Sequence, residues 1–236
     1  MSGPKNQHFV PRFYLNAFAI PESIASGEPK VYALGVHSDD DDQFIASTKN
    51  VAAEKFLYSP VGDDNKRDFT FEGKLADLEA LLSQLWRELA TGCISLEDGY
   101  RKGLAMFIAN LYLRHPRKRK VTRARLSHFQ GAIQAHLTAL GDSCQSIEFT
   151  LNNHKASVTL EEFEAEKAVD DNDYHKHFVE YVESNTIDLA KILLKRRWNV
   201  IVSPKRRFIT SDNPVCLTGP AHKPFGFETE GTVITL

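Results

Sequence analysis

The chain has 236 residues, of which 42% are hydrophobic, which excludes a disordered or fibrous protein and allows one large core or two small ones. Its 29 basic and 31 acidic residues give a formal charge of -2, which excludes a global attraction to nucleic acid or to membranes. Three widely spaced cysteines without a CxxC pair are typical of a reducing compartment, so we expect a cytoplasmic protein. The polar N-terminus and the interrupted apolar stretch Leu104–Leu113 predict neither a signal peptide nor a membrane span, which needs roughly 20 apolar residues.

The first elements that the sequence predicts are short strands. Residues 31–36 and 43–47 are rich in β-branched and aromatic residues and predict a hairpin. The four aspartates Asp39 to Asp42 repel one another, so we place them at its solvated tip rather than in a cation site. A short helical turn is predicted for residues 50–58, before a surface loop rich in Gly, Asp and Asn.

Helical periodicity dominates the middle of the chain. Leucines recur every three or four residues from Leu75 to Leu89, and a second helix is predicted from Ser95, where Ser-Leu-Glu-Asp approximates a capping box. The apolar face of that second helix comprises Leu104, Phe107, Ile108 and Leu111. Pro116 ends or kinks it, and a third helix is expected to about Leu140, with an inward stripe of Leu126, Phe129, Ile133 and Leu137.

The C-terminal third combines one more helix with short strands. Residues 143–158 allow a strand pair, and Thr159 with Glu162 repeats the capping pattern. A long helix from Asp173 to Arg196 would bury Phe178, Val182, Leu189 and Leu193. A second hairpin is predicted from the β-rich runs 198–202 and 208–210, and a last strand from residues 232–236.

These elements predict a fold class. We expect a single α+β domain over residues 1–236, in which a helical region at about 73–196 packs against a small, mainly antiparallel sheet of N- and C-terminal strands. The last strand is either a natural terminus pinned into the sheet or the point at which a longer chain is cut, and the sequence leaves both open.

Basic residues are gathered in two blocks. Residues 114–125 and 195–207 contain 13 of the 29 Lys and Arg residues and no acid. Such blocks displace counterions from a polyanion, which predicts a phosphate-binding face. The alternative is two solvated helix ends, of which the C-terminal one complements the helix macrodipole, although cations just after Pro116 would lie at the positive end of their helix. The predicted binding residues are Arg114, Arg117, Lys118, Arg119, Lys120, Arg196, Arg197 and Arg206.

Polar side chains alternate with apolar anchors near the N-terminus, in Asn6-Gln7-His8-Phe9-Val10-Pro11-Arg12-Phe13-Tyr14-Leu15. His8 can take or give a proton near neutral pH, and the planar fork of Arg12 suits a carboxylate or a phosphate. Asn6 and Gln7 add amides that bind or orient a ligand. The alternative is a tied-down segment in which these groups satisfy backbone carbonyls or a buried carboxylate.

A second motif, Thr210-Ser211-Asp212-Asn213-Pro214-Val215, follows a predicted strand. Pro214 restricts Asn213 to extended conformations and Asx side chains bond to nearby backbone, so a structural turn explains the motif. The functional alternative makes Asp212 a metal ligand or general base and Asn213 its orienting partner. The chain lacks the P-loop, dinucleotide, zincin and hydrolase-elbow patterns.

Both end motifs also carry a family resemblance. The segment Lys5–Leu15, the segment Lys49–Tyr58, the helical run Phe107–Arg114 and the stretch from Arg197-Trp198 to Ile209–Val215 resemble the family called domain of unknown function 4238. This resemblance covers nearly the whole chain, and its end motifs are specific in order and spacing. It implies a mainly bacterial, stand-alone soluble protein with no established activity. Members of that family usually continue into a strand followed by Pro-Leu-Ser, whereas this sequence ends at Leu236, so the resemblance leaves open whether the last sheet is complete.

From the residues themselves we expect a phosphodiesterase or nuclease, most simply a metal-assisted one, in which the two motifs meet. Asp212 would hold a divalent cation such as Mg²⁺ or activate water, His8 would be the general acid or base, and Arg12 would stabilise phosphate charge. Asn6, Gln7 and Asn213 would orient these groups. Metal nucleases usually offer two or more carboxylates, so a further ligand such as Glu54 is needed.

A different class of function is also open. Both motifs then brace the fold, and the basic surface alone binds nucleic acid or another polyanion, or the chain binds a protein partner, as an interaction component of a bacterial defence or toxin locus would. The sequence predicts no oligomeric state.

Overall fold

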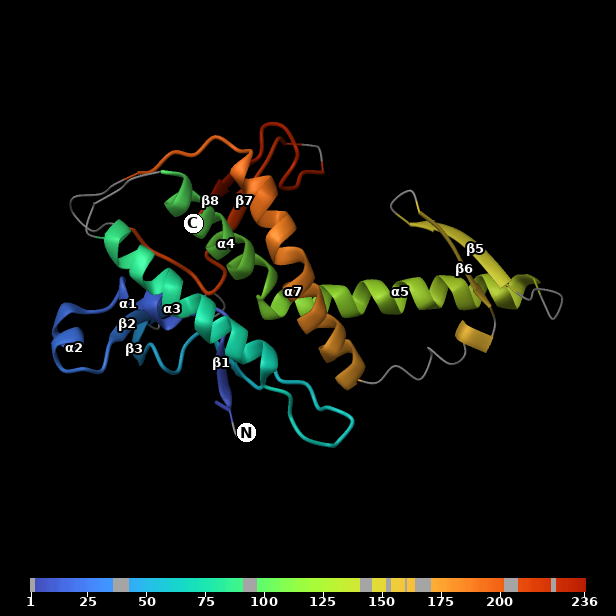
Figure 1. Ribbon diagram of the computed structural model, residues 1–236, viewed down its shortest axis with the longest axis horizontal. Helices are drawn as coiled ribbons and strands as arrows, with labels where there is room; N and C mark the ends of the chain where they lie inside the picture. The colour runs from blue at the N-terminus through green and yellow to red at the C-terminus, as the bar shows by residue number, and fades with distance from the viewer. Residues whose placement is uncertain are drawn as a thin grey trace. The chain divides into compact units, whose positions relative to one another are not determined.

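The computed structural model describes residues 3–35, 43–90, 97–140, 146–151, 154–159, 161–163, 171–201, 208–221 and 224–236 (Figure 1). The chain groups into two compact units, residues 1–116 with 179–236, and residues 117–178. Strands in the described ranges pair as two-stranded antiparallel ladders between and beside long helices. The α+β class is therefore confirmed, although the small sheet that we expected is divided among separate ladders. A single domain over the whole chain stays a prediction.

The N-terminal motif starts the fold as a strand. β1 (Asn6–His8) pairs antiparallel with β4 (Ala53–Lys55), and His8 lies opposite Ala53. The helical turn predicted for residues 50–58 is wrong, because ladder bonds to β1 hold the middle of that segment extended. The flanking residues Ala52 and Phe56 have left-handed φ values of 52° and 54°, and the Ala52 carbonyl accepts the Phe9 N–H at 2.9 Å. The position of His8 is thus fixed by a segment well removed in sequence.

The predicted first hairpin is confirmed. β2 (Lys30–Leu34) and β3 (Gln43–Ser47) pair antiparallel, with Tyr32 opposite Ile45. The aspartates assigned to its tip lie outside the described residues. Two short helices, α1 (Arg12–Asn16) and α2 (Pro21–Ala25), connect β1 to this hairpin.

Two long helices confirm the helical middle of the chain: α3 (Thr70–Ala90) and α4 (Asp98–Leu113). The Asp68 carboxylate accepts the Thr70 N–H at 2.8 Å, which satisfies a donor at the start of α3. Glu97 is the N-cap of α4, and the capping residue that we predicted, Ser95, lies outside the described residues. Every residue predicted for the apolar face of α4 is buried: Leu104, Phe107, Ile108 and Leu111.

Aromatic rings join these elements. The Tyr14 ring lies 4.9 Å from Trp86 and 5.9 Å from Phe107, so α1, α3 and α4 meet around it. Aromatic pairs of this geometry contribute about 0.5–1.5 kcal/mol each beyond the area that they bury. The packing anchors α1, and with it the N-terminal motif, to the two long helices.

α7 (Asp171–Leu194) confirms the long C-terminal helix, and its predicted core residues Phe178, Val182, Leu189 and Leu193 are all buried. The hairpin predicted after it is wrong for the described part of that region, because residues 198–201 and 208–210 belong to no strand. The Trp198 indole N–H donates to the Leu193 carbonyl at 2.9 Å, which turns the chain back onto the helix end. β7 (Cys216–Thr218) instead pairs with β8 (Val233–Thr235), which confirms the last predicted strand.

The smaller unit contains most of α5 (Pro116–Leu140), which begins where predicted, and the ladder of β5 (Ser146–Leu151) with β6 (His154–Thr159). Thr159 and Glu162 form the predicted capping box: the Thr159 N–H donates to the Glu162 carboxylate at 2.8 Å, and the Glu162 N–H donates to the Thr159 hydroxyl at 3.1 Å. Within the described ranges, no helix is both long enough and apolar enough to span a bilayer.

Candidate functional site

His8 is the centre of the candidate site. Its ring is half-buried, and Nε2 lies 3.1 Å from the Thr48 carbonyl oxygen. Since a carbonyl only accepts, Nε2 carries the hydrogen and Nδ1 keeps a lone pair. Burial lowers the pKa of His8 below its usual value; the Thr48 carbonyl and Glu79 act in the opposite direction, while Arg12 and Arg114 lower it further. A neutral imidazole with a free acceptor nitrogen is therefore favoured.

Arg12 is the cation of the site that is not fully enclosed. It begins α1, four positions after His8 at the end of β1, and its side chain is half-buried. Its Nε is buried and has no hydrogen-bond partner among the described residues. A buried guanidinium N–H without an acceptor costs free energy unless a ligand or water supplies one. Arg12 is therefore suited to receive an anion beside His8.

Arg114 and Glu79 form a partly buried ion pair within electrostatic reach of His8. Nη1 of Arg114 lies 2.7 Å from the Glu79 carboxylate, and its Nε donates to the Phe9 carbonyl at 3.0 Å. The Arg114 side chain is 1% exposed. The Arg114 guanidinium is therefore enclosed and already pairs with a carboxylate, unlike the exposed basic residues of the phosphate-binding face that we predict, and its own role in binding stays a prediction. Its contact with the Phe9 carbonyl ties α4 to the N-terminal motif.

Glu72 completes a pair of carboxylates on α3. It lies seven positions before Glu79 on the helix, which places both on one side. Burial and the neighbouring charge of Glu79 raise the pKa of Glu72 to about 7, against the opposite influence of Arg114. Close to neutral pH, Glu72 is therefore divided between its protonated and ionised forms, while Glu79 is held by Arg114.

Gln7 has a structural role in this arrangement. Its side chain is fully buried; the amide N–H₂ donates to the Ser59 hydroxyl at 2.6 Å, and the amide oxygen accepts the Tyr58 N–H at 2.6 Å. The Tyr58 hydroxyl in turn donates to the Arg114 carbonyl at 2.9 Å. Both ends of the Gln7 amide are thus used inside the protein, and a role of Gln7 in binding or orienting a ligand stays a prediction. Asn6, its neighbour in β1, is exposed.

A hydrogen bond joins the C-terminal motif to the N-terminal one. The Tyr14 hydroxyl lies 2.9 Å from the Thr210 hydroxyl. Asp212 is exposed two residues further on, and the Asn213 N–H donates to the Ser211 hydroxyl at 3.1 Å, as the structural-turn alternative predicts. The groups that bear on the pKa of His8 are Thr48, Glu79, Arg12 and Arg114. The carboxylate whose charge acts on His8 is therefore Glu79, from α3.

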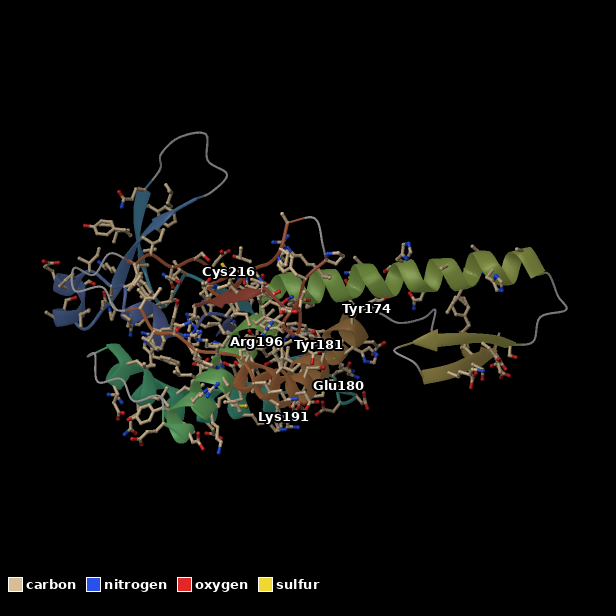
Figure 2. The ribbon with its side chains drawn as sticks, turned by 90° about the horizontal axis from the view of Figure 1, so that it is seen from above. Tyr174, Glu180, Tyr181, Lys191, Arg196 and Cys216 are labelled. Atoms are coloured by element: carbon tan, nitrogen blue, oxygen red, sulfur yellow. The ribbon has the colours of Figure 1, made fainter. Side chains whose placement is uncertain are left out.

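The remaining basic residues differ in their surroundings. At the start of α5, Arg117 and Lys120 are exposed, Lys118 and Arg119 are partly exposed, and the first turn contains no acid. Arg196, labelled in Figure 2, follows α7 and donates to the carbonyls of Phe227 and Thr229 at 2.8 and 2.9 Å, so its charge braces a loop. Arg197 is exposed, and Arg206 lies outside the described residues.

A divalent cation does not fit beside His8. Arg12 and Arg114 already place two positive charges there, and the Glu79 carboxylate is taken by Arg114. In the described parts of the chain, no group of three or more His, Cys, Asp or Glu side chains is placed to hold a metal ion. Asp212 and Glu54, the predicted ligands, are both exposed, and Glu54 lies in β4 opposite Gln7. No step of the chemistry below therefore depends on a metal.

Two residues of the site, Glu72 and Glu79, are absent from our sequence prediction. A signal for them exists: Glu72, Leu75, Glu79 and Leu82 follow one another at spacings of three and four, so two acids share a stripe with two buried leucines. Acids are seldom buried unless they are paired, which makes such a stripe informative. Arg114, the ion-pair partner of Glu79, lies at the end of α4, so the sequence of α3 does not identify it.

Comparison with known proteins identifies one match. The model of the family described as "Protein of unknown function (DUF4238)" matches residues 6–234. No curated protein and no solved structure shows significant similarity to the chain. The matched residues include both end motifs and every residue of the site around His8.

Proposed function

Because this chain belongs to the DUF4238 family of proteins of unknown function, we propose an activity from its own site: a phosphodiesterase or nuclease that acts on nucleic acid. The observation that supports it most directly is the environment of His8. Its Nε2 is engaged by the Thr48 carbonyl at 3.1 Å, and Arg12 lies near enough to influence its titration. An imidazole whose Nδ1 keeps its lone pair, within electrostatic reach of a half-buried guanidinium, is suited to accept a proton from a substrate whose phosphate that guanidinium binds.

The roles follow from the contacts. His8 accepts a proton from the attacking hydroxyl or water, and Arg12 binds the phosphate oxygens as negative charge grows on them. Glu79 favours the imidazolium that forms, while Arg114 holds Glu79 through the 2.7 Å ion pair. For the C-terminal motif, we propose that Asp212 acts as a general base and that Asn213 orients it. The Tyr14–Thr210 hydrogen bond attaches this motif to α1.

Three substitutions test this proposal: His8→Ala, Arg12→Ala and Asp212→Ala. The assay measures cleavage of labelled single- and double-stranded RNA and DNA, and binding to the same oligonucleotides is measured separately. Loss of a positioned acid or base lowers the rate roughly 10²–10⁴-fold, so H8A and D212A should lower cleavage by about that factor while binding survives, and R12A should weaken both cleavage and binding because Arg12 contacts the phosphate. Matched controls at exposed positions are His128→Ala, Arg87→Ala and Asp77→Ala. Equal cleavage by H8A and H128A would contradict the role of His8.

The basic start of α5 supports a second candidate, a non-catalytic nucleic-acid-binding module. Exposed Arg117 and Lys120 lie in a first turn without acids, where the helix dipole gives no reason for cations. Under this alternative the wild-type protein binds oligonucleotides and never cleaves them. The double variant Arg117→Glu with Lys120→Glu should then weaken binding and reduce its salt dependence, because phosphate contacts set that slope. A charge reversal at exposed Lys30 and Lys55 provides the control.

A further inference from the structure

The tautomer of His8 limits the kind of nucleophile that the site can activate. Nε2 is held by the Thr48 carbonyl at 3.1 Å, so the proton acceptor is Nδ1. The Thr48 carbonyl belongs to the turn after β3, and the Thr48 side chain is fully buried, so this anchor is rigidly packed. The site therefore offers one well-oriented base to the substrate.

Charge around His8 favours an anionic substrate and disfavours a bound cation. Arg12 and Arg114 both lie within electrostatic reach of the ring, and Glu79, the carboxylate whose charge acts on the ring, is paired with Arg114. Arg114 itself is enclosed, at 1% exposure, so Arg12 is the cation that can meet a phosphate. Hydrolysis of DNA needs an activated water and a stabilised leaving oxygen, which nucleases usually obtain from clustered carboxylates and metal ions. The site around His8 supplies one base and one accessible cation instead.

RNA needs only those two groups, because it carries its own nucleophile. We propose that the substrate is RNA, cleaved by attack of its 2′-hydroxyl on the adjacent phosphorus. His8 Nδ1 takes the 2′-hydroxyl proton, the O2′–P bond forms, and the P–O5′ bond breaks. The same proton passes from His8 to the leaving O5′, so neither water nor a metal ion is consumed. Arg12 stabilises the extra negative charge on the phosphorane oxygens, and Glu79 stabilises the transient imidazolium.

This inference rests on the proposed function and makes it more specific. The products must be a 2′,3′-cyclic phosphate and a 5′-hydroxyl, whereas attack by water leaves a phosphate monoester and an unmodified hydroxyl. Glu79 and the Thr48 carbonyl are positioning groups, since they act on His8 rather than on the substrate.

The experiment uses the wild-type full chain with three oligonucleotides of one sequence: all RNA, all DNA, and DNA with a single ribonucleotide. Each is incubated with and without EDTA, and the ends are identified by mass spectrometry. We expect cleavage of the RNA and cleavage of the mixed strand only after its ribonucleotide. The all-DNA strand should stay intact, the ends should be cyclic phosphate and 5′-hydroxyl, and EDTA should change nothing.

Other outcomes separate this inference from the proposed function. Cleavage of all-DNA at a similar rate, RNA products with 5′-phosphate ends, or loss of cleavage in EDTA would overturn the RNA inference and leave a nuclease. No cleavage of any strand would overturn both. His8→Ala should lower the RNA rate roughly 100-fold or more, with exposed His128→Ala as its control. If H8A does not fold, the end-group analysis of the wild type still decides, because it needs no variant.

Discussion

Tyr14 and Thr210, which lie 196 positions apart in the chain, are joined by a hydrogen bond of 2.9 Å between their hydroxyl groups. Tyr14 belongs to α1, the helix that begins with Arg12, and Thr210 opens the Asp-Asn-Pro motif. The Tyr14 hydroxyl has its pKa raised by burial, so it remains a neutral donor or acceptor throughout the range in which the protein works. The two ends of the chain are thus attached at the point where the sequence places its two motifs.

Tyr14→Phe tests this attachment with little change of shape. The ring contacts with Trp86 and Phe107 stay, and one partly buried hydrogen bond is lost, so stability should fall by about 1 kcal/mol in urea unfolding. Hydrogen exchange should become faster in residues 208–215, because the motif loses its link to α1. Tyr32→Phe at a 61% exposed position is the control and should be neutral. Unchanged exchange in residues 208–215 would show that other contacts hold the motif.

Replacing Arg114 should destabilise the protein far more than breaking a surface ion pair. Arg114→Met removes the pair with Glu79, leaves that carboxylate without its partner and frees the Phe9 carbonyl, which predicts a loss of about 3–5 kcal/mol. The control is Lys74→Met, which breaks the exposed pair with Glu183 and should cost less than about 1 kcal/mol. Urea unfolding of both variants measures the difference. Similar losses of stability in the two variants would mean that burial of Arg114 does not strengthen its contribution to the free energy of unfolding.

The fold was largely predictable from local patterns. Spacings of three and four located α3, α4, α5 and α7, because burial of one helix face produces that period directly. β4 was missed because its conformation is imposed by β1, and a three-residue strand has no period of its own. The β-rich residues 198–201 were misleading for the same reason: Trp198 is fixed by its bond to the Leu193 carbonyl rather than by a partner strand.

The candidate site was predicted only in part. His8 and Arg12 stand out in the sequence because ionisable groups are interleaved with apolar anchors. Arg114 was grouped with the exposed basic block that follows it, since a run of cations does not show which member points inward. Its burial depends on Glu79, on another helix, and on the Phe9 carbonyl. Contacts of this kind join residues far apart in sequence and leave no local pattern.

Gln7 should be intolerant of substitution although it takes no part in the proposed chemistry. Gln7→Leu keeps the side-chain volume similar but leaves the Tyr58 N–H and the Ser59 hydroxyl without their partner, which predicts a loss of about 1–3 kcal/mol. The neighbouring exposed Asn6→Leu is the control, and it should change stability by less than about 0.5 kcal/mol. Thermal unfolding of the two variants makes the comparison. Equal stability of Q7L and the wild type would mean that water replaces both bonds.

Glu72 should make stability depend on pH. Its pKa in the folded protein, about 7, lies above the value of 4.5 for a free glutamate, so the native state favours the neutral carboxyl. The stabilisation that Glu72 contributes is therefore complete below pH 4.5 and is lost as the pH rises through 7. Glu72→Gln stays neutral at every pH, so its stability relative to the wild type should rise between pH 5 and pH 8. Discounted for partial exposure, the gain is about 1–2 kcal/mol.

Denaturant unfolding at pH 5, 6, 7 and 8 measures this difference between Glu72→Gln and the wild type. His8 also contributes to the pH dependence of stability; because burial lowers its pKa in the folded protein, its contribution is lost as the pH falls, but His8 is present in both proteins and its effect largely cancels in the comparison. The matched control is Asp77→Asn, which removes one charge from an exposed position of the same helix. A difference that stays constant from pH 5 to pH 8, as D77N should give, would mean that Glu72 is ionised in the folded protein at all of these pH values. The electrostatic influence of Glu79 and the burial of Glu72 would then be too weak to retain a proton there.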